Sequence, residues 1–158
     1  MTQIIPSLAA ISEQYEALFV DLWGCVHNGI AALPEAVAAL QSYRAHGGTV
    51  VLVTNSPRPR VGVEAQLKHF GVPDDAWDSI ATSGDSARAA MFQSVVGKRV
   101  YFIGLPHDLP FFDPIHVVSN PVEITRVALD EAEGIVCTGP FDGTVDPTIL
   151  LPDLRLAQ

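Results

Sequence analysis

The sequence is poor in basic residues: nine lysines and arginines stand against 18 acidic residues, for a net charge of −9 over 158 residues. No run of lysine or arginine supplies the positive surface that a nucleic-acid-binding protein needs, so nucleic acid is excluded as a partner. No apolar stretch approaches the roughly 20 residues of a membrane span, and the first residues lack the basic and long apolar regions of a signal peptide. We therefore expect a cytoplasmic protein with no membrane partner.

Cysteine is also scarce. Cys25 and Cys137 lie far apart and have no metal-type spacing, which predicts two reduced, structural cysteines. A nucleotide-binding domain of the dehydrogenase type is disfavoured, because no G-x-G-x-x-G follows the first predicted strand. What the chain does have is 48% hydrophobic residues, enough for about one ordinary globular domain.

Short apolar runs alternate with segments of helical spacing. Strands are predicted at 17–21, at 49–55 and within DSIATSG, and helices from Pro34 to the glycines at 47 and 48, over 60–70 and over 85–93. The run TVVLVTN is uninterrupted and β-branched, as in a parallel strand covered on both faces. The alternation predicts an α/β fold with a doubly wound parallel sheet.

The alternation of predicted strands and helices becomes irregular near residue 97. A strand is predicted over 100–103, but prolines at 106, 110, 114 and 121 predict loops until the strand at 134–139, and the tail shows no convincing final element. We therefore predict a core over residues 1–96 and a second, smaller module over 97–158.

Two predicted strands end in polar residues. FVD ends in Asp21 and VLVT ends in Thr54, and ligands of open α/β sheets bind outside the carboxyl ends of the strands. Each residue alone reads most simply as a turn or helix cap. Together, with Gly24 permitting close backbone approach and Asn55 adding a donor, they favour a functional site.

The chemistry open to this pair is specific. A carboxylate at Asp21 can attack phosphorus to give an aspartyl-phosphate, provided that a divalent cation offsets the repulsion between the anions. The Thr54 hydroxyl and the backbone amides near Asn55 can hold the phosphoryl oxygens as preorganised donors. These residues therefore predict phosphoryl chemistry at the sheet edge.

The motifs that surround these residues resemble a known family. FVDLWGCVHNG followed by VVLVTNSPRP resembles the first two motifs of the haloacid dehalogenase (HAD) superfamily. TNSPRP together with IATSGDSARAAM and YFIGLPHDLPFF resembles its class IIA branch, which contains sugar-phosphatase-like and nitrophenylphosphatase-like hydrolases. The resemblance covers nearly the whole chain, and this pair of motifs is much more specific than a lone glycine motif.

The resemblance implies a Rossmann-like core with a parallel sheet and an inserted α/β cap domain that begins at roughly Gly97. It implies Mg²⁺ and the hydrolysis of a small-molecule phosphate monoester, either sugar-phosphate-like or an aryl phosphate. Carried over by position, Asp21 is the nucleophile and a metal ligand, and the Trp23 carbonyl is a second metal ligand. Thr54 and Asn55 bind the phosphate.

Two departures from the family pattern lead to further expectations. Trp23 occupies the position of the usual general-acid aspartate, and an indole does not exchange a proton at neutral pH, so a good leaving group such as a phenolate is favoured. His27 is the nearest candidate replacement, although a loop histidine more commonly serves as a surface or hydrogen-bonding residue. The alternative function is a catalytically impaired module that binds a phosphate ligand.

The second departure concerns the family's later lysine and acidic pair, which follow the cap, whereas this chain ends at Gln158 within the cap. We therefore expect the front half of a longer enzyme, with little turnover by the 158 residues alone. A three-stranded core also exposes a strand edge that needs cover, which a homodimer or a missing segment would provide. The substrate is not specified, because the cap selects it in this family.

Overall fold

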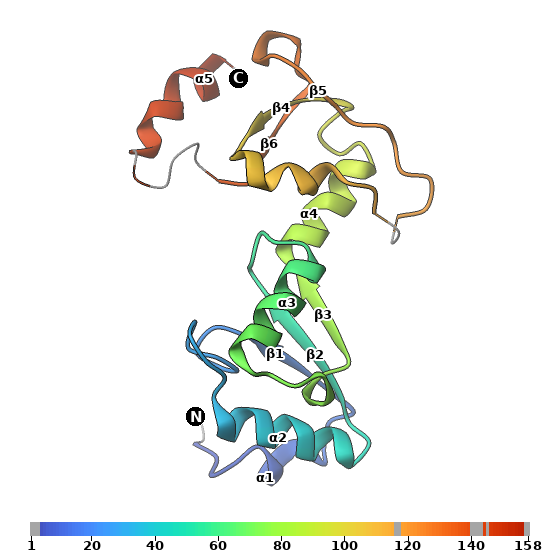
Figure 1. The fold of residues 1–158 in the computed structure, drawn as a ribbon. Helices are drawn as coiled ribbons and strands as arrows, with labels where there is room; N and C mark the ends of the chain where they lie inside the picture. Colours follow the sequence, from blue (N-terminus) through green and yellow to red (C-terminus); the bar gives the residue numbers. More distant parts are fainter. Residues whose placement is uncertain (1–3, 116–117, 140–143, 145, 157–158) are drawn as a thin grey trace. The chain divides into compact units, whose positions relative to one another are not determined.

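The computed structural model describes residues 4–115, 118–139, 144 and 146–156. The chain divides after Asp85 into two compact units, and the division falls inside the helix α4 (Ser83–Phe92) (Figure 1). The end of that helix belongs to the second unit because Met91 and Phe92 are part of its hydrophobic core. The assignment of residues 1–96 to a core and 97–158 to a cap stays a prediction.

The first unit is built on a parallel sheet whose strands are β1 (Ala17–Asp21), β2 (Thr49–Thr54) and β3 (Ser79–Thr82), in the order β1-β2-β3. Asp21 pairs in register with Val53, and Thr54 pairs with Thr82. All three strands therefore end at the same edge of the sheet. The fold is α/β with parallel strands, as the alternation of apolar runs predicts.

Helices cover one face of this sheet. They are α2 (Pro34–Ala45) and α3 (Arg60–Phe70), with a 3₁₀ turn, η1 (Asp74–Ala76), before β3. The short helix α1 (Ala9–Ser12) contacts α2. Parallel strands added in one direction through right-handed connections place their helices on the same side of a sheet. The buried apolar residues that join the helices and strands are Val37, Leu40, Tyr43, Val50, Leu52, Val63, Leu67 and Ile80.

The opposite face of the sheet is open. Phe19 is 78% exposed and Val53 is 41% exposed, and Ala81, in register with Val53, is exposed as well. The prediction that the TVVLVT strand is covered on both faces is therefore wrong for the described part of the chain. The strand is as apolar as one buried on both faces. Whether both faces are buried depends on which other elements pack against the sheet.

One ionic contact joins α2 to the start of β3. Asp78 accepts hydrogen bonds from Nη2 and Nε of Arg44, at 2.6 and 3.0 Å, and from the backbone N–H of Val50, at 2.7 Å. The Arg44 guanidinium is the main cause that holds the pKa of Asp78 below its ordinary value, and the Val50 N–H adds to the effect. This carboxylate therefore links helix and sheet in its charged form.

The second unit contains another parallel sheet, formed by β4 (Arg99–Ile103), β5 (Thr125–Arg126) and β6 (Gly134–Cys137) in the order β5-β4-β6. Its shorter elements are the 3₁₀ turns η2 (Pro106–Phe112), η3 (Leu129–Glu131) and η4 (Pro147–Leu150) and the helix α5 (Leu151–Leu156). Two predictions are corrected here. The proline-rich stretch contains η2 in place of a loop, and the tail contains η4 and α5.

Both cysteines are unpaired and exposed. The prediction that both cysteines are structural is therefore wrong, because neither side chain is buried in a hydrophobic core. In the part of the chain that the structure describes, no helix is long and apolar enough to cross a membrane.

Candidate active site

Asp21 lies exposed at the carboxyl end of β1. Its Oδ1 accepts a hydrogen bond of 2.8 Å from the backbone N–H of Leu22, which fixes the carboxylate at the point where the chain leaves the sheet. Because β1 and β2 pair in parallel, the prediction that the strands ending in Asp21 and Thr54 are neighbours is confirmed. A charged group therefore stands at the edge where ligands of such sheets bind.

The loop after Asp21 is held by hydrogen bonds to one backbone carbonyl group, that of Leu22. The backbone N–H groups of Val26 and His27 both donate to the Leu22 oxygen, at 2.9 and 3.2 Å. Gly24 takes a left-handed conformation, with φ of +76°, and donates to the His27 oxygen at 2.8 Å. This bonding makes the loop a defined platform beside the carboxylate.

Trp23 is 69% exposed although it has the largest side chain in the loop. Its indole lies against the backbone of Gly29, where a Cβ would come within 2.5 Å of the ring. The ring also meets His27 edge-on, with 6.0 Å between ring centroids. The residue at the usual general-acid position is thus a fixed aromatic surface.

His27 does not replace the missing acid. Its side chain is only 3% exposed, and Nδ1 accepts a 3.1 Å hydrogen bond from the Gly29 N–H, which assigns the proton of the neutral ring to Nε2. Burial lowers the pKa of His27, and the negative charge of Asp21 offsets part of that change. His27 is therefore neutral near pH 7 and serves to hold the loop.

Thr54 and Asn55 lie at the same edge as Asp21. Thr54 is half-buried, and its Oγ1 accepts a hydrogen bond of 3.2 Å from the Ser56 N–H, so the hydroxyl also stabilises the turn after β2. The alternation of a β-strand places its side chain on the opposite face from that of Val53, the partner of Asp21 in register. Asn55 is exposed beyond the end of the strand. Their roles in phosphate binding stay predictions.

The start of α4 holds the segment that contains Asn55. The Ser83 hydroxyl donates to the carbonyl oxygens of Asn55 and Ser56, at 2.9 and 2.8 Å, and the Gly84 N–H donates to Ser56 at 3.1 Å. Sequence reasoning assigned no role to Ser83 or Gly84. A signal was present, because residues directly after a third parallel strand must lie at the same edge as Asp21.

The metal-ligand prediction rests on oxygen donors. A carboxylate such as that of Asp21 and a carbonyl such as that of Trp23 are donors that Mg²⁺ prefers, and Mg²⁺ is commonly held by one or two carboxylates, water and phosphate oxygens. Among the described residues there is no group of three or more His, Cys, Asp or Glu that could hold a metal ion. The donor chemistry fits Mg²⁺ held with water and phosphate, and the ligand assignments stay predictions.

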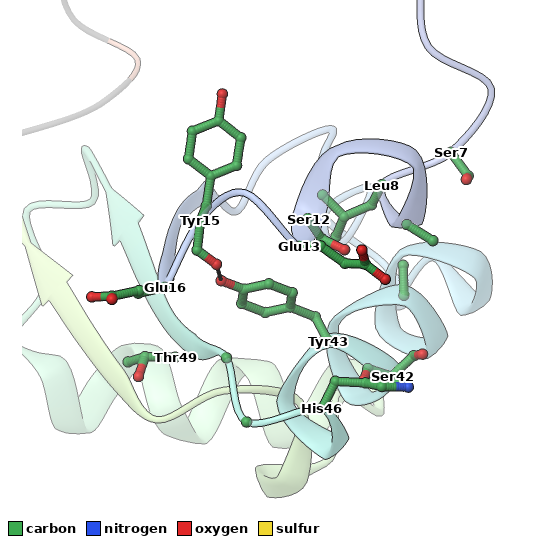
Figure 2. Close-up of a pocket in the computed structure, with 14 residues that line it drawn as sticks. Ser7, Leu8, Ser12, Glu13, Tyr15, Glu16, Ser42, Tyr43, His46 and Thr49 are labelled. Carbon is green, nitrogen blue, oxygen red and sulfur yellow. Dashed lines mark hydrogen bonds between the residues drawn. The ribbon is translucent and has the colours of Figure 1, made fainter.

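The first unit has a hollow of about 800 Å³, and it does not contain the candidate site (Figure 2). Its lining includes Glu16 and Thr49, which lie at the amino ends of β1 and β2, and Tyr43, whose hydroxyl donates to the Tyr15 carbonyl at 2.6 Å. A five-residue strand at about 3.3 Å per residue separates this end of β1 from Asp21 by roughly 16 Å. Asp21 therefore stands at an open edge rather than in this hollow.

Comparison with protein families finds a match over residues 18–116 to the family described as haloacid dehalogenase-like hydrolase. A comparison with curated proteins finds no match. Among solved structures, a haloacid dehalogenase-like family hydrolase from Brucella suis is similar to 97% of this chain, with 38% identity and a TM-score of 0.83.

Two more distant structures share the fold. A 4-nitrophenylphosphatase from Thermotoga maritima has 21% identity over 92% of the chain and a TM-score of 0.63. A possible sugar phosphatase of the HAD superfamily from Cytophaga hutchinsonii has 19% identity over 98% of the chain and a TM-score of 0.66. The chain spans about half the length of these solved relatives: 54%, 52% and 56% of the three structures in the order given.

Proposed function

Because the chain belongs to the haloacid dehalogenase-like hydrolases, we propose that it carries the nucleophile of a Mg²⁺-dependent phosphatase that acts on a small-molecule phosphate monoester. The observation that carries this proposal is the exposed carboxylate of Asp21 at the end of β1, directly beside the strand that ends in Thr54. Parallel α/β sheets bind their ligands at this edge.

Asp21 acts as the nucleophile. The Leu22 N–H orients the carboxylate by holding Oδ1, and attack by a carboxylate oxygen forms an Asp–O–P bond while the P–O bond of the ester breaks. Water then attacks phosphorus, the Asp–O–P linkage breaks, and inorganic phosphate leaves with a proton passing to solvent. The carboxylate of Asp21 is regenerated.

The segment after β2 holds the phosphoryl group. The Thr54 hydroxyl and the polar groups of Asn55 supply donors, and the Ser83 hydroxyl keeps the segment in place by sharing its one hydrogen between two backbone carbonyl oxygens. Asp21 and the Trp23 carbonyl are the ligands we assign to Mg²⁺, which would neutralise charge on the phosphoryl oxygens when bound.

The test is hydrolysis of p-nitrophenyl phosphate with Mg²⁺ by the wild-type protein and by Asp21→Asn, which keeps the shape of the side chain and removes the nucleophile. Asp74→Asn is the matched control, because Asp74 is an exposed aspartate in η1. We expect the 158 residues to show a low turnover that requires Mg²⁺ and that is abolished by Asp21→Asn alone. Turnover by Asp21→Asn at a rate close to that of the wild type would contradict the mechanism.

A second candidate function is a module that binds a phosphate ligand without turnover. Trp23 favours it, because a positioned acid–base group contributes about 10² to 10⁴ in rate and the indole cannot supply one. Calorimetric titration with inorganic phosphate separates the two. Binding of phosphate at the site, without hydrolysis of any monoester in the presence of Mg²⁺, would favour the binding module.

A further inference from the structure

Trp23 is an aromatic side chain that the fold holds in solvent at the candidate site. Tryptophan normally contributes a large buried surface, so an indole that is 69% exposed forgoes much of that stabilisation. One edge of the ring lies against Gly29 and another meets His27, while the remaining surface is open. Fixed, exposed aromatic rings are the residues that most commonly anchor ligands and partners.

The surroundings of Trp23 are already ordered. Oδ1 of Asn28 accepts hydrogen bonds from the N–H groups of Ile30 and Ala31, at 2.9 and 2.8 Å, and Nδ1 of His27 accepts one from Gly29. These bonds fix the Gly29 backbone against which the indole rests. A ligand that stacks on the ring therefore meets a preorganised surface and loses little conformational entropy in ordering it.

The indole is within reach of a substrate at Asp21. The two residues are separated by one position, so their Cα atoms lie at most about 7 Å apart. When a phosphoryl group contacts the Asp21 carboxylate, the oxygen of its leaving group lies one P–O bond beyond the phosphorus. A tryptophan side chain at position 23 is long enough to reach a group at that position. A leaving group on that phosphoryl group is therefore within reach of the exposed indole.

The same residue limits which leaving groups depart. Trp23 has no acidic proton to give to the leaving oxygen, and His27 is buried with Nδ1 held by the Gly29 N–H, so the leaving group must depart as an anion. A phenol, with a pKa of about 10 as in tyrosine, tolerates this far better than an aliphatic alcohol. The missing acid and the exposed ring therefore favour one class of substrate for two separate reasons.

We propose that Trp23 is a specificity-determining residue that selects aryl phosphates, an inference that rests on the proposed function. The aromatic ring of the leaving group stacks on the exposed surface of the indole. As the bond from Asp21 to phosphorus forms, the P–O bond to the aryl group breaks and its electron pair leaves on the phenolate oxygen, which requires no proton from the protein.

The test uses phenylphosphonate and methylphosphonate, two non-hydrolysable probes that share the phosphoryl group and differ in the aromatic ring. Their affinities are measured by calorimetry in the presence of Mg²⁺ for the wild type, Trp23→Ala and Trp23→Phe. Stacking predicts that the wild type binds phenylphosphonate about 3- to 10-fold more tightly than methylphosphonate. Trp23→Ala should lose this preference, and Trp23→Phe should keep most of it.

A fluorescence measurement tests whether the aromatic ring of the probe contacts Trp23. The chain has two tryptophans, and the buried Nε1 of Trp77 has no hydrogen-bond partner among the described residues, so Trp77→Phe is a tolerable background that leaves Trp23 as the reporter. Phenylphosphonate should change the emission of this variant and methylphosphonate should not. Equal affinities for the two probes, or a preference that survives Trp23→Ala, would overturn the inference alone. Failure of both probes to bind would overturn the proposed function with it.

Discussion

Gly84, at the start of α4, stands directly against the carbonyl group of Pro57. A Cβ at position 84 would lie 2.2 Å from that oxygen and 2.6 Å from the carbonyl oxygen of Arg58, closer than real Cβ contacts. The chain that follows Thr54 and Asn55 is therefore pressed against the start of α4. The absence of a side chain at Gly84 lets the proposed phosphate-binding segment take its position.

Gly84→Ala should destabilise the protein and displace this segment. Alanine normally stabilises a helix by about 1 kcal/mol relative to glycine, but overpacking against a rigid backbone costs about 1–3 kcal/mol and should dominate. Gly62→Ala in α3 is the matched control, because its Cβ would meet only the Arg58 side chain, at 3.6 Å. Denaturant unfolding should show a loss for Gly84→Ala only. Equal stabilities would show that the contact relaxes freely.

Thr54→Ala tests the proposed phosphate donor. Loss of one such donor typically lowers turnover by about 10² to 10³, and Thr54→Ser should restore most of it by keeping the hydroxyl. The hydroxyl also accepts from the Ser56 N–H, so unfolding free energies are measured in parallel. A loss of stability with unchanged turnover would assign Thr54 to the turn alone.

The stability of the first unit should depend on pH through Asp78. Its pKa is lowered in the folded state, chiefly by Arg44, so its contribution is fully present above the ordinary aspartate pKa of about 3.9 and is lost as the pH falls through the folded value. The difference in unfolding free energy between wild type and Asp78→Asn should be largest near pH 7 and should shrink below about pH 4. A constant difference across this range would contradict the assignment.

In the second unit, Arg88 is a buried side chain whose loss should be costly. Its Nε and Nη2 donate to the carbonyl oxygens of Phe111 and Asp113, at 2.9 and 2.7 Å, and so hold the end of η2. Hydrogen bonds from charged groups contribute about 1.5–3 kcal/mol, so Arg88→Met should lower the unfolding free energy by at least this much. The exposed Arg155→Met is the control. Arg88→Lys should not rescue stability, because lysine lacks the planar fork, and full rescue would contradict this account.

Much of the fold is readable from local signals. The strand at 17–21 and the helix at 60–70 are predicted with the bounds that the structure has. The end of the helix is predictable because Gly71 follows it, and its φ of +84° is the left-handed conformation that closes helices. The neighbouring ends of β1 and β2 follow from the same alternation. These features depend on residues close together in the sequence.

Features that depend on tertiary contacts are not readable in this way. The stretch with Pro106 and Pro110 predicts a loop, yet Pro106 opens η2 and the carboxylate of Asp108 accepts from the Leu105 N–H. Likewise, the apolar run TVVLVTN predicts cover on both faces, which the described residues do not provide at Val53. The support of the site by Ser83 involves residues 27 and 28 positions apart, beyond any local pattern.

The central claim, nucleophilic attack by Asp21, is tested most directly by looking for the covalent intermediate. The protein is mixed with p-nitrophenyl phosphate and Mg²⁺, quenched in acid and analysed by intact-mass and peptide mass spectrometry. The lack of an acid–base group at Trp23 should slow attack by water and allow the intermediate to accumulate. We predict one added phosphoryl group on the peptide that contains Asp21, removable by hydroxylamine and absent from Asp21→Asn. A phosphoryl group that persists in Asp21→Asn, or turnover of the ester without any adduct, would contradict the account.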